Sequence, residues 1–166
     1  MSFTIKMWSP FDSGGCTGTQ GGPNSGGHTG SHWYIRYGMD LKAKAGTPVY
    51  AAFDGYVTKF DRPPDSSSVY GNQIFVRAHN NRMGGFYTHL DGARWSANSK
   101  VVMGCYLGTV MRDHLHMAIV EIIGGLPGGH YQGVDIFKPF LTMSLRNGYI
   151  NVTFKQDYSA PVVQPL

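Results

Sequence analysis

Residues 37–57, which read YGMDLKAKAGTPVYAAFDGYV, decide the fold of this chain. Two short β-type runs, residues 47–52 and 55–60, flank the turn signal Asp54-Gly55. Helical periodicity is weak throughout, and only residues 136–141 suggest a short helical turn. Further β-type runs, mostly separated by turn signals such as Pro63-Pro64-Asp65, lie at residues 72–79, 85–90, 105–111, 114–122 and 149–154. The sequence therefore predicts a mostly antiparallel β-sheet protein with few helices.

The composition of the chain supports this fold class and excludes several mechanisms. Charged residues make up 14% of the 166 residues, against about 25% in ordinary domains, and 23 residues are glycine. Glu121 is the only glutamate. Mechanisms that need paired glutamates, and zinc helices of the H-E-x-x-H type, are therefore excluded.

The charge pattern bears on possible partners. The formal net charge is +4, but the 14 Lys and Arg residues are scattered singly along the chain. We therefore expect no dedicated nucleic-acid binding. No run approaches 18 apolar residues, and residues 1–6 lack the pattern of a signal peptide. We expect no membrane insertion, and an export signal that was removed or never existed.

The histidines at positions 114 and 116 are the first candidates for chemistry. In a strand, residues i and i+2 project from one face about 6.6 Å apart, so the two imidazoles of His114-Leu-His116 can converge on one point. This geometry suits a metal site or acid–base catalysis. The same pattern also fits a solvated strand surface, and the spacing alone leaves both interpretations open.

Four ordered motifs carry a resemblance to a known family: G-x-D ending at Asp40, A-G-T-P-V-Y-A-x-x-D-G ending at Gly55, Y-x-H-L containing His89, and the H-x-H of His114 and His116. In this order they resemble the LytM-like M23 peptidases, which include the lysostaphin-type enzymes. The resemblance divides the chain into a Gly/Ser-rich loop region at residues 1–33, a LytM/M23-like β domain at 34–142, and a C-terminal strand and tail at 143–166 packed on the same domain.

The resemblance implies a β-sheet groove that holds one zinc on two histidines and one aspartate, with two further histidines for catalysis. Asp40 and His116 match zinc ligands, while His89 and His114 match the catalytic pair. The implied substrate is peptidoglycan or a similar peptide-linked cell-wall polymer or glycan. A secreted location, or one facing the cell wall or periplasm, follows from that substrate.

The remaining zinc ligand of the family is a histidine four residues before the aspartate, and here that position is Arg36. A guanidinium has no free lone pair for zinc. His32 or His28 of the Gly-rich loop can substitute, although an extended strand would place His32 about 13 Å beyond position 36. Alternatively, Arg36 pairs with Asp40 on one strand and leaves a site without metal, in which case Arg36→His should restore zinc binding. A weakly held zinc on Asp40 and His116, or a shifted register, is the third alternative.

Two functions therefore compete: a zinc endopeptidase, and a degenerate relative that binds wall polymers without cutting them, as a lectin-like or regulatory module.

The sequence also leaves open whether Cys16 and Cys105 form a disulfide or remain two thiols. We interpret His79 as a solvated residue at a strand end, and His130 as part of a loop. Four aromatic residues can line a groove or simply pack in the β protein: Trp33, Tyr34, Tyr37 and Tyr70.

Overall fold

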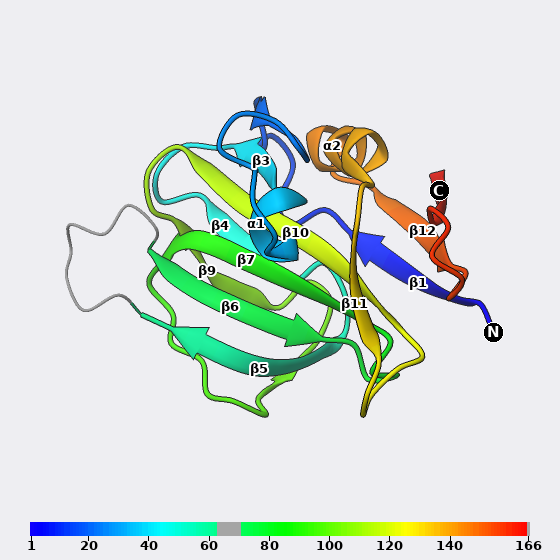
Figure 1. Ribbon diagram of the computed structural model, residues 1–166. Helices are drawn as coiled ribbons and strands as arrows, with labels where there is room; N and C mark the ends of the chain where they lie inside the picture. Colours follow the sequence, from blue (N-terminus) through cyan, green and yellow to red (C-terminus); the bar gives the residue numbers. More distant parts are fainter. Residues whose placement is uncertain (63–70, 166) are drawn as a thin grey trace.

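A computed structural model describes residues 1–62 and 71–165 of the chain, which form two antiparallel sheets and two short helices (Figure 1). Every strand pairing among these residues is antiparallel, which confirms the predicted fold class. The predicted turn at residues 63–65 and the aromatic residue Tyr70 lie outside the described residues. Neither helix of the described chain is long and apolar enough to cross a membrane.

The larger sheet has the strand order β2-β3-β10-β7-β6-β5-β8, and outside this order β11 pairs with β10, β9 with β7, and β4 with β9. Its strands include all the β-type runs predicted between residues 47 and 122. Their bounds are β2 (Gly18–Gly21), β3 (Met39–Lys42), β4 (Pro48–Tyr50), β5 (Gly55–Asp61), β6 (Asn72–Arg77), β7 (Met83–Asp91), β8 (Lys100–Val101), β9 (Tyr106–Val110), β10 (His114–Ile123) and β11 (His130–Val134).

Strand β10 positions the candidate site because it lies between β3 and β7. Its register places His116 opposite Asp40 of β3 on one side and opposite Thr88 of β7 on the other. Residues that face each other across an antiparallel pair project from the same side of the sheet. The pairing therefore brings the H-x-H strand, Asp40 and the neighbour of His89 to one face.

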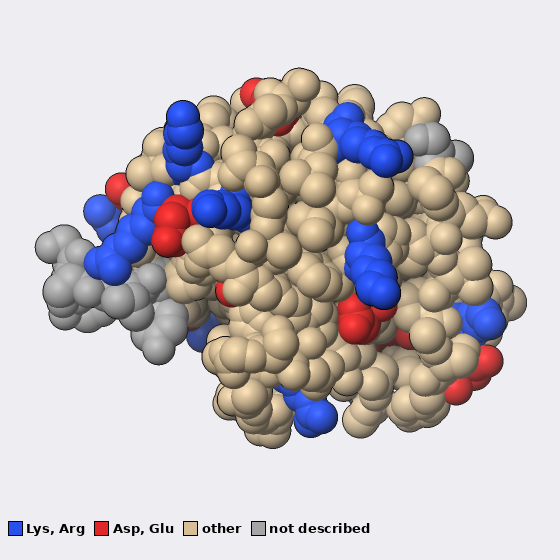
Figure 2. Space-filling model, turned by 90° about the horizontal axis from the view of Figure 1, so that it is seen from above, with Lys and Arg blue, Asp and Glu red and all other residues tan. Residues whose placement is uncertain are grey.

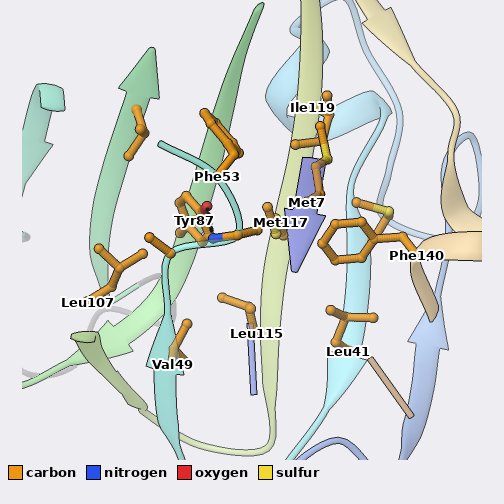
Figure 3. Packing of buried hydrophobic residues seen from close by; sticks show 14 of the residues in the cluster. Met7, Leu41, Val49, Phe53, Tyr87, Leu107, Leu115, Met117, Ile119 and Phe140 are labelled. Carbon is orange, nitrogen blue, oxygen red and sulfur yellow. Dashed lines mark hydrogen bonds between the residues drawn. The ribbon is translucent and has the colours of Figure 1, made fainter. Parts of the chain in front are cut away.

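The opposite face of β10 fills the core. Leu115, Met117 and Ile119 alternate with the histidines and are fully buried, and Figure 3 shows them packed among side chains of several neighbouring elements. Burying a side chain of this size contributes about 1.5–3 kcal/mol. A one-residue slip of β10 would turn these three side chains out of the core and point the histidines into it, so the core fixes the register of the site.

A smaller sheet of β1 (Phe3–Trp8), β12 (Tyr149–Phe154) and β13 (Val162–Pro165) joins the two ends of the chain. Met7 of β1 and Val152 of β12 belong to the same buried cluster as the large sheet. Residues 1–33, expected to be a loop region, thus contain two strands, β1 and β2. Strand β2 reads GTQG, which has no apolar alternation, and it is a strand because it pairs with β3.

A helix replaces the short turn predicted at residues 136–141: α2 runs over Phe137–Arg146. The N-cap residue, Ile136, makes no side-chain capping hydrogen bond. The Asp135 carboxylate instead accepts a hydrogen bond from the backbone amide of Phe137. The helix buries Phe140 and Met143 against the core and ends at Asn147 in the left-handed conformation. Tertiary burial stabilises a segment whose sequence carries no strong helix-start signal.

The two cysteines are free thiols, with Cys16 buried and Cys105 half-buried. Burial raises the pKa of the Cys16 thiol, while its hydrogen bond to the Gly18 carbonyl opposes this effect less strongly.

We expect two thiols per chain by alkylation and mass spectrometry, with Cys16 reacting only after denaturation. Reductant should leave the melting temperature unchanged. A reductant-sensitive melting temperature would contradict this structure, because a disulfide closing such a loop is worth about 4–5 kcal/mol.

Candidate metal centre

Three side chains from distant parts of the sequence converge on one face of the larger sheet: His28, Asp40 and His116. The Nδ1 atom of His116 lies 3.1 Å from Oδ1 of Asp40, and Nε2 of His28 lies 3.2 Å from Oδ2 of the same carboxylate. One ligand atom from each residue lies within 4.8 Å of the other two. His28 and His116 are buried and Asp40 is half-buried, so water does not fully solvate the group.

The outer nitrogens of both histidines are fixed by backbone carbonyl groups. His28 Nδ1 lies 2.8 Å from the Gly22 oxygen, and His116 Nε2 lies 2.7 Å from the Tyr34 oxygen. A carbonyl oxygen only accepts hydrogen bonds, so each outer nitrogen must donate. In the neutral rings, the inner nitrogens then present lone pairs toward the Asp40 carboxylate. Three acceptor groups that face one another suit a cation, and fixed outer nitrogens are typical of metal-binding histidines.

The electrostatics of Asp40 favour its charged form. Burial raises the pKa of this carboxyl, but when the neighbouring rings are protonated, a hydrogen bond from His116 and the positive charges of His116, His28 and His114 outweigh burial. The pKa of Asp40 therefore lies below its ordinary value, and Asp40 is a carboxylate at neutral pH. An ionised oxygen ligand and two imidazole nitrogens form a donor set that zinc binds well.

His28 reaches the site because the segment between it and Asp40 is folded back. The Ser25 hydroxyl donates to the Gly22 carbonyl at 2.6 Å, and the His28 amide donates to the Ser25 carbonyl at 2.8 Å, which orders the Gly-rich turn. Helix α1 (Trp33–Arg36) then shortens the path to β3. A helix rises about 1.5 Å per residue, against about 3.3 Å in a strand. Distances counted along an extended strand, such as the one predicted for His32, therefore do not apply to this segment.

Arg36 does not occupy the ligand position that the motif spacing implied for it. It ends helix α1, its side chain is exposed, and its Nε donates to Oδ1 of Asn24 at 2.7 Å. The predicted pairing of Arg36 with Asp40 is therefore wrong for the described residues: the carboxylate instead contacts histidines. Arg36 and Asp40 do not share a strand because α1 ends before β3 begins.

His32, the other candidate substitute, stays outside the cluster. It is exposed, and its ring stacks on Tyr34 with the ring centres 5.1 Å apart. His79 is exposed near Tyr56, and His130 is exposed at the start of β11. Trp33 and Tyr34 line a small hollow, whereas Tyr37 packs against Gly133.

The predicted catalytic pair lies beside the three-residue cluster. The rings of His89 and His114 are 4.6 Å apart between centres, and those of His89 and His116 are 5.9 Å apart. Nε2 of His114 is 3.8 Å from Oδ1 of Asp40. A surface hollow lined by His89, Arg112 and His114, among others, opens at this point. A reacting group bound there can contact both imidazoles.

His89 takes its position from an irregularity in β7. Between the pairs Tyr87–Ile74 and Leu90–Asn72, two residues of β7 oppose a single residue of β6, which is a β-bulge. His89 has φ of 63°, in the left-handed region that is uncommon for residues other than glycine. Such backbone strain concentrates at functional sites, where the surrounding structure holds it. The bulge turns His89 toward His114.

Gly38 leaves the space in which the His116 ring sits. A Cβ atom at this position would overlap Cε1 of His116 and come within 2.7 Å of its Nε2. We expect Gly38→Ala to displace the ring, weaken zinc binding measured by calorimetry, and lower the free energy of unfolding by about 1–3 kcal/mol. Gly148→Ala is the matched control because a Cβ there meets open space. Unchanged zinc affinity in Gly38→Ala would contradict this placement of His116.

Two histidines and an aspartate facing one point, with two further histidines alongside, form the kind of site found in zinc hydrolases. The comparison with protein families agrees with this class: the model of peptidase family M23 matches residues 34–125, more than half of the chain. The chain belongs to peptidase family M23. His28 lies before the matched segment, so the third member of the cluster comes from outside it.

Several solved structures share the fold. The M23 metalloprotease pseudoalterin, from the deep sea, has 16% identity and a TM-score of 0.55, with 96% of each chain covered. A zinc-containing peptidase from Vibrio cholerae has 20% identity and a TM-score of 0.53 over 70% of this chain and 37% of that one. Lysostaphin from Staphylococcus simulans has 21% identity and a TM-score of 0.52 over 83% of this chain and 55% of that one. No relative is found among curated protein sequences.

The chain thus spans about a third of the Vibrio cholerae peptidase and about half of lysostaphin. At these identities the similarity concerns the fold, a mostly antiparallel sheet with two short helices.

Proposed function

We propose that this chain is a zinc-dependent endopeptidase that cleaves peptide bonds in peptidoglycan or a similar peptide-linked cell-wall polymer. The observation that carries the proposal is the convergence of His28, Asp40 and His116 with both outer histidine nitrogens hydrogen-bonded to backbone carbonyl groups. These three residues would hold the zinc, which supplies Lewis-acid chemistry for hydrolysis of an amide when bound.

The neighbouring histidines have distinct tasks in this proposal. His114 accepts the proton of the attacking water, because its Nε2 is directed toward the Asp40 side of the site. His89, on the other side of the hollow, donates a hydrogen bond to the carbonyl oxygen of the substrate as negative charge develops on it. Each of these contributions is typically worth about 100-fold in rate or more.

The substrate class rests on membership in the M23 family and on the resemblance to lysostaphin-type enzymes. Such a polymer lies outside the cell membrane, so we propose a secreted or wall-facing location. The surface seen in Figure 2 is mostly uncharged, and its Lys and Arg side chains do not merge into a continuous basic patch. The scattered charges on this face therefore give no support for nucleic acid as the partner.

The alternative, a binding module without activity, depended on Arg36 standing in place of a zinc ligand. Arg36 contacts Asn24 and lies outside the cluster, so that reason no longer applies. His28 supplies the missing imidazole nitrogen.

The test combines metal analysis with an assay of purified cell walls. We expect one zinc per chain after dialysis from zinc-containing buffer, and clearing of a wall suspension that a chelator abolishes and added zinc restores. Released peptides identified by mass spectrometry would locate the bond. Stoichiometric zinc without cleavage, together with retention of the protein on insoluble walls, would contradict the endopeptidase and favour the binding module.

A further inference from the structure

We propose that Asp113 is a positioning residue for His114: its carboxylate keeps the proton of the neutral imidazole on Nδ1, so that the lone pair of Nε2 faces the candidate metal centre. This inference rests on the proposed endopeptidase function for its consequence in catalysis. The position of the hydrogen on the His114 ring is inferred from geometry alone.

The contact between the two side chains is short and directional. Oδ1 of Asp113 lies 2.7 Å from Nδ1 of His114, while Nε2 at the other side of the same ring lies 3.8 Å from Oδ1 of Asp40. A carboxylate only accepts hydrogen bonds, so Nδ1 must carry the hydrogen. A neutral imidazole holds one such hydrogen, and the bond to Asp113 therefore leaves Nε2 free to accept a proton from water.

Asp113 is itself held from two sides. Its backbone carbonyl accepts a hydrogen bond from the Ala43 amide at 3.0 Å, which ties it to the residues that follow β3. Its carboxylate also forms a hydrogen bond with the side chain of Gln20 in β2. The bond from His114 and then the bond from Gln20 lower the pKa of Asp113, so it remains ionised at neutral pH. The N-terminal strand β2 thus supports the site although it lies outside the family match.

The exposure of Asp113 separates this role from a merely structural one. Its side chain is 65% exposed, and an exposed ion pair contributes little to stability because water screens it. Removal of the carboxylate should therefore leave the melting temperature nearly unchanged. The expected effect is confined to the proton position on His114 and to the rate of the chemical step.

The experiment compares Asp113→Asn and Asp113→Glu with the wild type, using nitrogen NMR of the His114 ring in zinc-loaded protein and steady-state cleavage of a wall peptide. The asparagine amide can donate to Nδ1, which moves the ring hydrogen to Nε2. We expect this reversed tautomer in Asp113→Asn, with kcat about 10- to 100-fold lower and KM unchanged. Asp113→Glu should keep the wild-type tautomer and recover most of kcat.

Asp61→Asn is the matched control because it removes the same charge from a surface pair with Lys59, two strands beyond β7. It should change neither the tautomer nor kcat. Retention of the Nδ1–H tautomer and of full kcat in Asp113→Asn would overturn the inference. A wild-type protein that cleaves nothing would contradict the proposed function instead, while a tautomer that reverses in Asp113→Asn would still support the positioning of His114.

Discussion

His28→Ala is expected to abolish stoichiometric zinc binding and to lower zinc affinity by about 100-fold or more. His28 contributes one of three ligand atoms that lie within 4.8 Å of one another, and its Nε2 is held toward Asp40 by the bond between Nδ1 and the Gly22 carbonyl. Loss of a residue that only orients a ligand already costs about 10- to 100-fold in affinity, and loss of the ligand itself should cost at least as much. The measurement is calorimetric titration with zinc, accompanied by metal analysis.

His32→Ala and Arg36→His are the matched controls for His28. His32→Ala removes the same side chain from an exposed position in the same loop region, and should leave zinc affinity unchanged. Arg36→His adds an imidazole at the ligand position implied by the sequence, but that residue ends α1 and contacts Asn24. We expect no gain in affinity. A strong gain in Arg36→His, with no loss in His28→Ala, would show that the ligand set is wrong.

Removal of either catalytic candidate should lower turnover while zinc remains bound. We expect His114→Ala and His89→Asn each to reduce kcat by about 100-fold or more, as the loss of a general base or of an oxyanion donor does. Asparagine is preferred to alanine at position 89 because it tolerates the left-handed backbone of that residue, so the bulge in β7 is preserved.

His116→Ala separates the two kinds of role, since it should remove zinc as well as activity. Metal analysis and kcat are measured on the same preparations of all three variants. Equal zinc loss in the three proteins would mean that the ligands and the catalytic pair have been confused. Full zinc content with full kcat in His114→Ala would exclude His114 as the proton acceptor.

The structure also changes how the N-terminal region is understood. The Gly-rich segment that the composition marked as a loop carries His28, and β2 within it carries Gln20, which contacts Asp113. Both contributions come from residues before the segment that matches the M23 family. Truncation studies that begin at residue 34 would therefore remove part of the candidate site.

The sequence by itself determined the fold class and most of the sheet. Alternating apolar residues and turn signals are local patterns, and they predicted strands such as β5, β6 and β10. The two-residue spacing of His114 and His116 likewise placed both imidazoles on one face of β10, because side chains alternate along any strand.

Only the tertiary structure decided the third member of the candidate metal centre. Its position depends on a turn at Gly22–His28, on the helix α1 and on the pairing of β3 with β10, which bring residues far apart in sequence to one point. The spacing of the family's motif placed Arg36 at the site, because it puts the remaining ligand four residues before Asp40. The segment from His28 to Asp40 contains a helix and is therefore more compact than an extended chain of the same length. His28 contacts Asp40 for that reason.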